Sequence, residues 1–245
     1  IKSHLTKEIE LYGMGIKVLS LFFIDEVAKY KKYDAQHNPS NGEYADIFEA
    51  EYDTALNELL AEHPTGEYTN YLRQHSDASQ VHAGYFSVDK VKKSDKTIFV
   101  DFKSATEKKK NESVDKDAYD LIMKDKERLL SFEEPVRFIF SHSALKEGWD
   151  NPNVFQICTL KQSGAEIRKR QEIGRGMRLA VNQDGVRQDS DSLGDDVHNI
   201  NRLTIIANES YEKFARSLQE ELKEVLKDRP QTINEEWLRD KVLVN

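Results

Sequence analysis

Short apolar runs without regular alternation recur along the chain, and helical patterns separate them. A strand that is buried on both faces has this kind of sequence, and such strands belong to parallel sheets covered by helices. Strands that alternate with helices therefore predict an α/β fold with a mainly parallel sheet flanked by helices. The expected strands are residues 18–24, 136–141, 154–160 and 203–207, and the expected helices are residues 1–13, 25–33, 43–63, 68–75, 114–130, 164–179 and 209–227.

One long stretch interrupts this alternation and is expected to form an insertion of mixed α+β structure. Within it, residues 81–88 and 97–102 each have a strand pattern, and the polar stretch between them predicts a β-hairpin. The whole chain, 1–245, is then one domain, with a core at about 1–33 and 136–208, the insertion at about 34–135 and C-terminal helices over 209–245.

Composition limits the class of protein. The chain has 245 residues, 38% of them hydrophobic and 33% charged, so it can bury a proper core as one large domain or two small ones. Its single cysteine, Cys158, lies in an apolar run and is expected to be buried, which argues against a disulfide framework and favours a cytoplasmic protein. No apolar run reaches the roughly 18 to 20 residues that a membrane helix needs. The chain begins with Ile1 rather than methionine, which suggests an excerpt from a longer protein.

Charge is distributed unevenly along the chain. The net charge of −8 argues against a grip on nucleic acid that involves the whole sequence. A local basic surface remains possible, because five basic residues fall within one short stretch: Arg168, Lys169, Arg170, Arg175 and Arg178. The histidines have no spacing typical of metal ligands, so no metal site is expected in this chain.

Residues 171–178 read QEIGRGMR. As a helix, this stretch places Gln171, Arg175 and Arg178 at spacings of four and three, on one face. Gly174 lies beside that face, where the absence of a side chain lets another group come close. Forked guanidinium groups beside such a gap suit a phosphate, because arginine stays charged and binds oxyanions in a planar, bidentate way. The alternative interpretation is a solvated basic helix face.

A second stretch, residues 140–153, reads FSHSALKEGWDNPN. Together the two stretches resemble motifs V and VI of superfamily 2 helicases and translocases, in the form of the Res subunit of type III restriction-modification enzymes. Residues 16–25 resemble the motif IV strand of that family, and residues 81–87 resemble a further segment of it. The matched positions are Gly148 and Asp150 for the G-x-D core of motif V, and Gln171, Gly174, Arg175 and Arg178 for Q-x-x-G-R-x-x-R of motif VI.

The resemblance implies the second RecA-like domain of an ATP-dependent DNA translocase, which is incomplete as an ATPase alone. ATP and Mg²⁺ would be bound mainly by a first RecA-like domain, and the other partners would be double-stranded DNA and the methyltransferase (Mod) subunit. A tryptophan after a strand, as at Trp149, is more often core packing than part of a site. The implied roles are γ-phosphate contact or coupling for Arg175, Arg178 and Gln171, nucleotide contact for Asp150, Gly148 and Gly174, and DNA-backbone contact for Ser143 and Lys146.

Three alternatives remain open at this point. Asp25 and Glu26 follow an apolar strand in the manner of a Walker B acid pair, although the sequence has no G-x-x-x-x-G-K-[S/T] phosphate loop. Asp89, Asp101 and Lys103 have the pattern of a PD-(D/E)xK nuclease, in which carboxylates bind Mg²⁺. The insertion could also be a non-catalytic docking module for the methyltransferase subunit.

Overall fold

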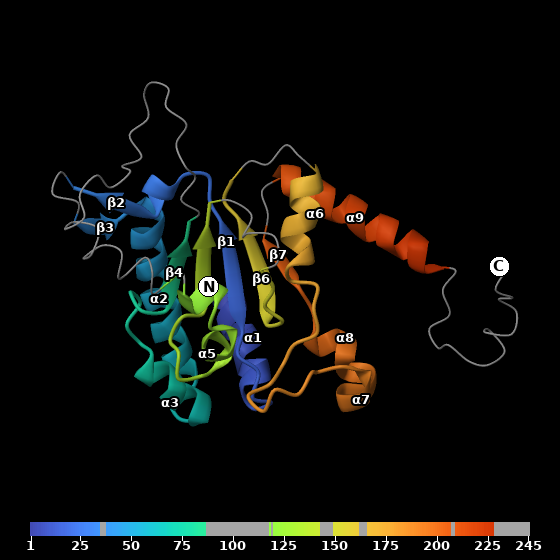
Figure 1. Cartoon of the computed structure of the whole chain (residues 1–245). Helices are drawn as coiled ribbons and strands as arrows, with labels where there is room; N and C mark the ends of the chain where they lie inside the picture. Colours follow the sequence, from blue (N-terminus) through green and yellow to red (C-terminus); the bar gives the residue numbers. More distant parts are fainter. Residues whose placement is uncertain are drawn as a thin grey trace, which may run out of the picture.

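The computed structural model describes residues 1–34, 38–86, 118, 120–142, 149–161, 166–206 and 209–227. Within them, five strands form one sheet in the order β4–β5–β1–β6–β7, and its neighbouring strands all pair in parallel (Figure 1). The predicted α/β class is therefore confirmed, and the arrangement is consistent with a RecA-like domain. The strands are β1 (Leu19–Phe23), β4 (His82–Tyr85), β5 (Phe138–Ser141), β6 (Val154–Thr159) and β7 (Thr204–Ile206).

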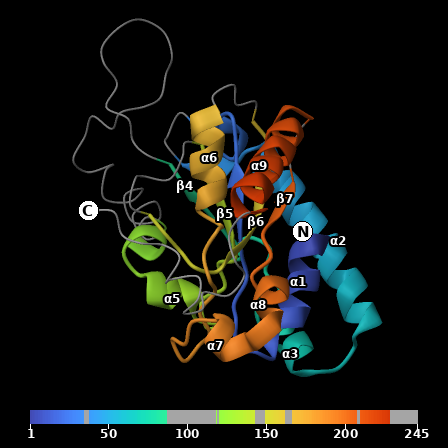
Figure 2. The same cartoon turned by 90° about the vertical axis from the view of Figure 1, so that its right-hand side faces the viewer.

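Helices cover both faces of the sheet. They are α1 (Lys2–Tyr12), α2 (Glu43–Glu62), α3 (Glu67–Gln74), α5 (Lys126–Leu130), α6 (Glu166–Gly174), α7 (Ser190–Leu193), α8 (Val197–Ile200) and α9 (Glu209–Lys227). The buried side chains of α1, α2 and α3 form one core with β5, while α5 and residues 121–122 belong to a core on the opposite face. Figure 2 shows α1 and α2 on one side of the strands and α5 and α6 on the other. Within the described residues, every helix is too short or too polar to cross a membrane.

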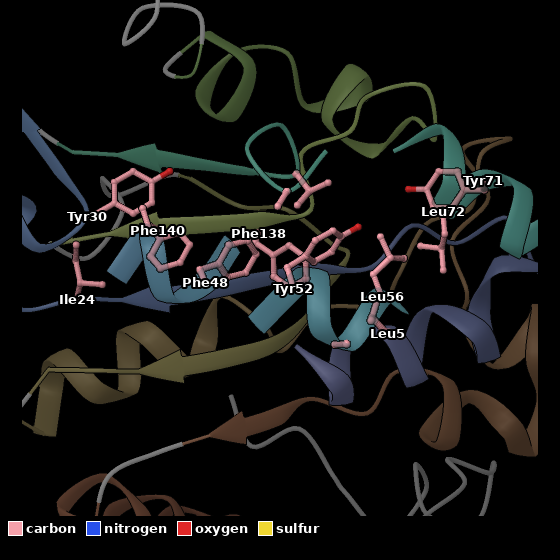
Figure 3. Close-up of a cluster of buried hydrophobic side chains, with 14 residues drawn as sticks. Leu5, Ile24, Tyr30, Phe48, Tyr52, Leu56, Tyr71, Leu72, Phe138 and Phe140 are labelled. Atoms are coloured by element: carbon pink, nitrogen blue, oxygen red, sulfur yellow. The ribbon is translucent and has the colours of Figure 1, made fainter. Parts of the chain in front are cut away.

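The core under α1, α2 and α3 is rich in aromatic side chains (Figure 3). The rings of Phe22 in β1 and Phe140 in β5 stack with their centroids 4.7 Å apart. Phe48 of α2 meets Phe138 of β5 edge-on at 4.8 Å, and Tyr52 of α2 is fully buried beside them. Aromatic pairs of this kind add to the stabilisation that burial provides. The apolar residues whose helical spacing predicts α2 therefore form the helix face that covers the sheet.

A buried ion pair lies at the amino end of β5. Arg137 donates from Nη1 to Oε2 of Glu8 at 2.7 Å, and neither side chain is more than 3% exposed. Arg137 also donates to the hydroxyl of Tyr52, and the hydroxyl of Tyr68 donates to Glu8 at 2.9 Å. Burial alone raises the pKa of Glu8, but the charge of Arg137, with smaller contributions from His4 and Tyr68, lowers the pKa to about 2. Glu8 therefore stays ionised and ties α1 to the sheet.

The predicted helix over residues 25–33 is wrong. A short 3-10 helix, η1 (Val27–Lys29), leads instead into β2 (Lys31–Tyr33), which pairs antiparallel with β3 (Pro39–Asn41). Tyr30, between η1 and β2, buries its ring in the aromatic core. Tertiary burial and pairing with a later segment override the local helical preference, and neither is visible in the sequence of 25–33 itself.

Gly42 lets the chain pass closely over η1, and its replacement tests this contact. A Cβ atom on Gly42 would lie 2.4 Å from the carbonyl carbon of Lys29, a backbone atom that cannot move easily. We expect Gly42→Ala to lower the free energy of unfolding by about 1 to 3 kcal/mol through overpacking. Gly13→Ala is the matched control, because a Cβ atom there meets nothing within 4 Å and Gly13 has helical dihedral angles. Urea denaturation of both variants measures the difference, and a Gly42→Ala variant as stable as Gly13→Ala would contradict the close contact.

Residues 81–88 also differ from the prediction. Their strand, β4, is parallel to β5 in the main sheet rather than half of a separate hairpin. The pairing joins segments far apart in the sequence, so local alternation could not reveal it. The expected hairpin partner at 97–102 lies outside the described residues, and that hairpin stays a prediction.

Two other segments are more finely divided than expected. The predicted helix over 114–130 is interrupted near Asp125, which begins α5 by accepting a hydrogen bond from the backbone N–H of Arg128. Residues 181–199 are not a plain loop, because they contain α7 and most of α8. The predicted long helix over 209–227 is confirmed as α9.

Candidate functional site

The arginine-rich stretch begins on α6 and continues beyond it. α6 follows β6 along the chain and ends at Gly174, so the predicted helix over 164–179 is too long. Beyond Gly174, the backbone N–H of Gly176 bonds to the carbonyl of Ile173 at 2.9 Å and closes a tight turn. Glycine is a poor helix former, and a Cβ atom on Gly176 would lie 2.5 Å from Cδ1 of Leu203. The chain therefore leaves the helix where it packs against the residue that precedes β7.

The sequence predicts that the three polar residues of this stretch share one helix face, but in the structure they do not. Gln171 is exposed on α6, whereas Arg175 and Arg178 lie in the segment after it. Arg175 is only 8% exposed and points inward, donating from Nη1 to the carbonyl oxygen of Trp149 at 3.0 Å. Arg178 is exposed and donates from Nη1 to the carbonyl oxygen of Arg175 at 3.3 Å. Gly174 has nothing within 4 Å of where a Cβ atom would be, so the space beside it is open.

Trp149 and Asp150 bring the motif V stretch against these arginines. Trp149 is 2% exposed and donates from Nε1 to the carbonyl oxygen of Ile122 at 2.7 Å, which confirms its packing role. Asp150 forms an ion pair with Lys126 of α5. The pKa of Asp150 is lowered, first by the hydrogen bond from Lys126 and in a smaller part by the nearby charge of Arg178. Two stretches that are separate in the sequence therefore form one polar cluster.

The electrostatics of the cluster separate its two arginines. Burial, and then the nearby charge of Arg178, lower the pKa of Arg175. Arginine nevertheless keeps its proton in proteins, because its ordinary pKa is so high. Arg175 is therefore a cation held against a backbone carbonyl, whereas Arg178 carries its charge at the surface, close to Asp150. The arrangement can present a guanidinium group to an anion that approaches from outside.

Two basic residues of α6, Lys169 and Arg170, contact α9. Lys169 is 6% exposed, and its ammonium group lies 5.5 Å from the centre of the Phe214 ring. Arg170 forms an ion pair with Glu221 of α9 at 2.6 Å. Lys169 is therefore buried, while Arg170 remains largely exposed in its pair. The side chain of Arg168 lies outside the described residues.

The structure also reveals an ion pair that the sequence analysis missed. Nζ of Lys161, just after β6, lies 2.6 Å from Oε1 of Glu172 in α6. The side chain of Lys161 is 7% exposed and that of Glu172 is fully buried. The available signals were a lysine at the end of a buried strand and an acid beside Ile173, which packs on Phe214. Neither signal identifies the residue with which the lysine or the acid pairs, so the ion pair could not be predicted.

The structure describes two further residues that the sequence singles out, Asp25 and Cys158. Asp25 follows β1 as predicted, where it forms an ion pair with Lys29 and accepts a hydrogen bond from Tyr44 at 3.2 Å. Among the described residues, no group of three or more histidine, cysteine or acidic side chains could hold a metal ion. Cys158 is buried with a free thiol, as predicted. Outside the described residues lie the DNA-contact candidates Ser143 and Lys146, the motif V residue Gly148, and the nuclease candidates Asp89, Asp101 and Lys103.

The parallel sheet flanked by helices is consistent with a RecA-like α/β domain. No protein-family model matches the chain. Three curated proteins are similar to it, and all are Res subunits of type III restriction-modification enzymes. The EcoPI subunit of Escherichia phage P1 is 44% identical over 186 residues, or 75% of this chain, and the EcoP15I subunit of Escherichia coli is 42% identical over the same length. The StyLTI subunit of Salmonella typhimurium is 32% identical over an alignment of 255 positions that covers 97% of this chain.

The homologues of this chain are therefore Res subunits of type III restriction-modification enzymes. The chain spans only a small part of each relative, between 17% and 22% of its length. The similarity supports a component of a type III restriction enzyme, and it extends over nearly the whole chain in one relative.

Proposed function

We propose that this chain is the second RecA-like half of the ATP-dependent DNA translocase in a type III Res subunit. The observation that carries the proposal is the cluster in which Arg175 meets the carbonyl of Trp149 while Arg178 lies beside Asp150. The motifs that contain these residues follow different strands, and the fold brings them together. A nucleotide-dependent motor needs such a cluster, because its two halves must respond to one bound phosphate.

In this proposal the two arginines have different tasks. Arg178 is exposed and carries the charge that reaches the γ-phosphate of ATP bound by the first RecA-like domain. Arg175 is buried against Trp149 and links motif VI to motif V. A displacement of Arg178 is therefore transmitted to Asp150 and to the proposed DNA-contact segment of motif V. Gln171 is exposed on α6 and responds, together with Arg178, to whether the γ-phosphate is present. Catalysis of phosphoryl transfer consists almost entirely of positioning and charge stabilisation, which is what guanidinium groups provide.

ATP and Mg²⁺ are assigned to the first RecA-like domain, because this chain has no phosphate loop of the G-x-x-x-x-G-K-[S/T] type. Double-stranded DNA and the methyltransferase subunit are the proposed partners, by analogy with the restriction-modification systems that the relatives' names describe. Ser143 and Lys146 stay candidates for contacts with the DNA backbone. The whole enzyme would then hydrolyse ATP when DNA is bound.

A direct test compares the 245-residue chain with a complete Res subunit that contains it. We expect the isolated chain to release phosphate from ATP no faster than a buffer control, with or without duplex DNA. The complete subunit with its Mod partner should show DNA-stimulated hydrolysis at about 1 to 10³ per second, the usual range of enzyme turnover. Sustained hydrolysis by the isolated chain would contradict the proposed division of labour between the two halves.

A further inference from the structure

The buried ion pair between Lys161 and Glu172 lies next to the motif VI residues without belonging to the cluster that they form. We propose that Lys161 and Glu172 are positioning residues, which hold α6 at one fixed place on the sheet so that Arg178, in the segment after it, meets the nucleotide. The inference rests on the proposed motor function. It goes further by assigning a role in turnover to a pair in which neither residue occupies a fixed position of motif VI.

Lys161 is fixed to the centre of the sheet. The residue before it, Leu160, donates its backbone N–H to the carbonyl oxygen of Phe23 at the end of β1, at 2.8 Å. The ammonium group of Lys161 lies 5.0 Å from the centre of the Phe23 ring. Strand β1 is the central strand and pairs with both β5 and β6. The position of Lys161 therefore follows the position of the motif IV strand.

Glu172 occupies the matching place on α6. It follows Gln171 directly, and its carbonyl oxygen accepts the backbone N–H of Arg175 at 3.3 Å. Its side chain is fully buried and reaches Lys161 at 2.6 Å. The same residue therefore contacts the sheet through its side chain and the arginine turn through its backbone. A rotation or slide of α6 would break the first contact and shift the second.

Burial makes this pair a strict restraint. If α6 moves, Lys161 and Glu172 separate in a region that water hardly reaches, so their close contact is lost without replacement by solvent. The pair between Arg170 and Glu221 joins the same helix to α9, but its side chains are 44% and 52% exposed. Water can replace either partner of an exposed pair, so that pair restrains α6 weakly. The ion pair with the sheet therefore restrains α6 more strongly than the ion pair with α9 does.

The restraint has a kinetic consequence, because a catalytic group must be placed closely. A displacement of about 1 Å that originates away from the reacting atoms can lower a rate by about 10²-fold. The effect falls on kcat rather than on ATP binding, since most contacts to ATP are made by the first domain. A residue that only stabilises the fold would instead change stability and leave kcat per folded molecule unchanged.

The experiment uses a complete Res subunit that contains this chain, with its Mod partner and a duplex DNA. Four forms are compared: wild type, Glu172→Gln, the charge-swapped Lys161→Glu/Glu172→Lys, and the matched control Glu221→Gln. For each form, the kcat and KM of DNA-stimulated ATP hydrolysis are measured, together with the melting temperature and the fraction of folded molecules. A fifth form, Arg178→Ala, tests the proposed function independently.

We expect Glu172→Gln to lower kcat by about 10²-fold with KM for ATP changed by less than about threefold, while Glu221→Gln matches wild type. The charge swap should recover part of the lost kcat, because it rebuilds the pair in reverse. A normal kcat per folded molecule in Glu172→Gln would overturn the positioning role, even if the melting temperature falls. If Arg178→Ala retains full turnover, the motor proposal itself fails, so the two failures are distinguishable.

Discussion

Replacing Arg178 with alanine in a complete Res subunit should lower DNA-stimulated ATP turnover by about three to five orders of magnitude, the range known for arginine fingers. Arg178 is the exposed guanidinium group of the cluster, and its charge already influences Asp150. A short apolar side chain cannot stabilise the charge that spreads over the transferring phosphoryl group. The measurement is the rate of phosphate release at saturating ATP and DNA.

Two further variants make this result specific. Arg216→Ala removes another exposed arginine, which pairs with Glu212 on the surface of α9, and it should leave turnover unchanged. Arg178→Lys keeps the charge but loses the planar fork, so we expect it to restore only part of the rate. All variants should melt like wild type, because Arg178 is exposed. Ordinary turnover in Arg178→Ala would refute the assignment of Arg178 to the γ-phosphate.

The second large effect concerns stability. Arg137→Met should lower the free energy of unfolding of the chain by about 3 to 5 kcal/mol, because it leaves the Glu8 carboxylate buried without its cation. The structure gives the reason: Arg137 and Glu8 are at most 3% exposed, and the pKa of Glu8 is held at about 2. The variant must either keep a buried charge or protonate Glu8 at neutral pH. Urea denaturation followed by circular dichroism measures the loss.

A double variant distinguishes the contribution of the ion pair to stability from the contribution of the packing around it. Arg137→Met combined with Glu8→Leu removes both charges, and we expect it to recover much of the loss, since apolar pairs often replace buried ion pairs well. Arg216→Ala serves again as the control, because surface pairs four residues apart on a helix contribute only about 0.3 to 0.5 kcal/mol. If Arg137→Met unfolds at the same urea concentration as Arg216→Ala, the buried pair does not hold α1 to the sheet.

Most strands of this fold were predictable, because a strand that is buried on both faces has a mostly apolar run that is visible in the local sequence. Residues 18–24, 136–141 and 154–160 are mostly apolar without regular alternation, and each contains a strand of the parallel sheet. The helix α2 was predictable for the same reason, since its apolar spacing matches the face that covers β5. The sequence did not reveal β4 as a sheet strand or β2 as part of a hairpin. The pairing of β4 is with β5, a segment far away in the sequence, and local preference carries no information about such a partner. The partner of β2 is the nearby β3, but the pattern of residues 25–33 favours a helix and does not indicate this pairing.

The candidate site was predictable as a set of residues but not as a geometry. The spacing of 171–178 selects Arg175 and Arg178 as candidates, yet it treats the stretch as one helix. The helix ends at Gly174, because Gly176 packs against Leu203. The inward direction of Arg175 depends on the carbonyl of Trp149, which is a backbone group and has no sequence signal. Contacts to backbone atoms are the part of a site that a residue pattern cannot specify.

The most direct test of the motor assignment is the structure of a complete Res–Mod–DNA complex with ADP and aluminium fluoride, which imitates the transferring phosphoryl group. The account predicts that a guanidinium nitrogen of Arg178 lies at hydrogen-bond distance, about 3 Å, from the fluoride atoms. Arg175 should remain on the carbonyl oxygen of Trp149. If the same complex hydrolyses ATP but Arg178 lies remote from the bound nucleotide, the account is contradicted.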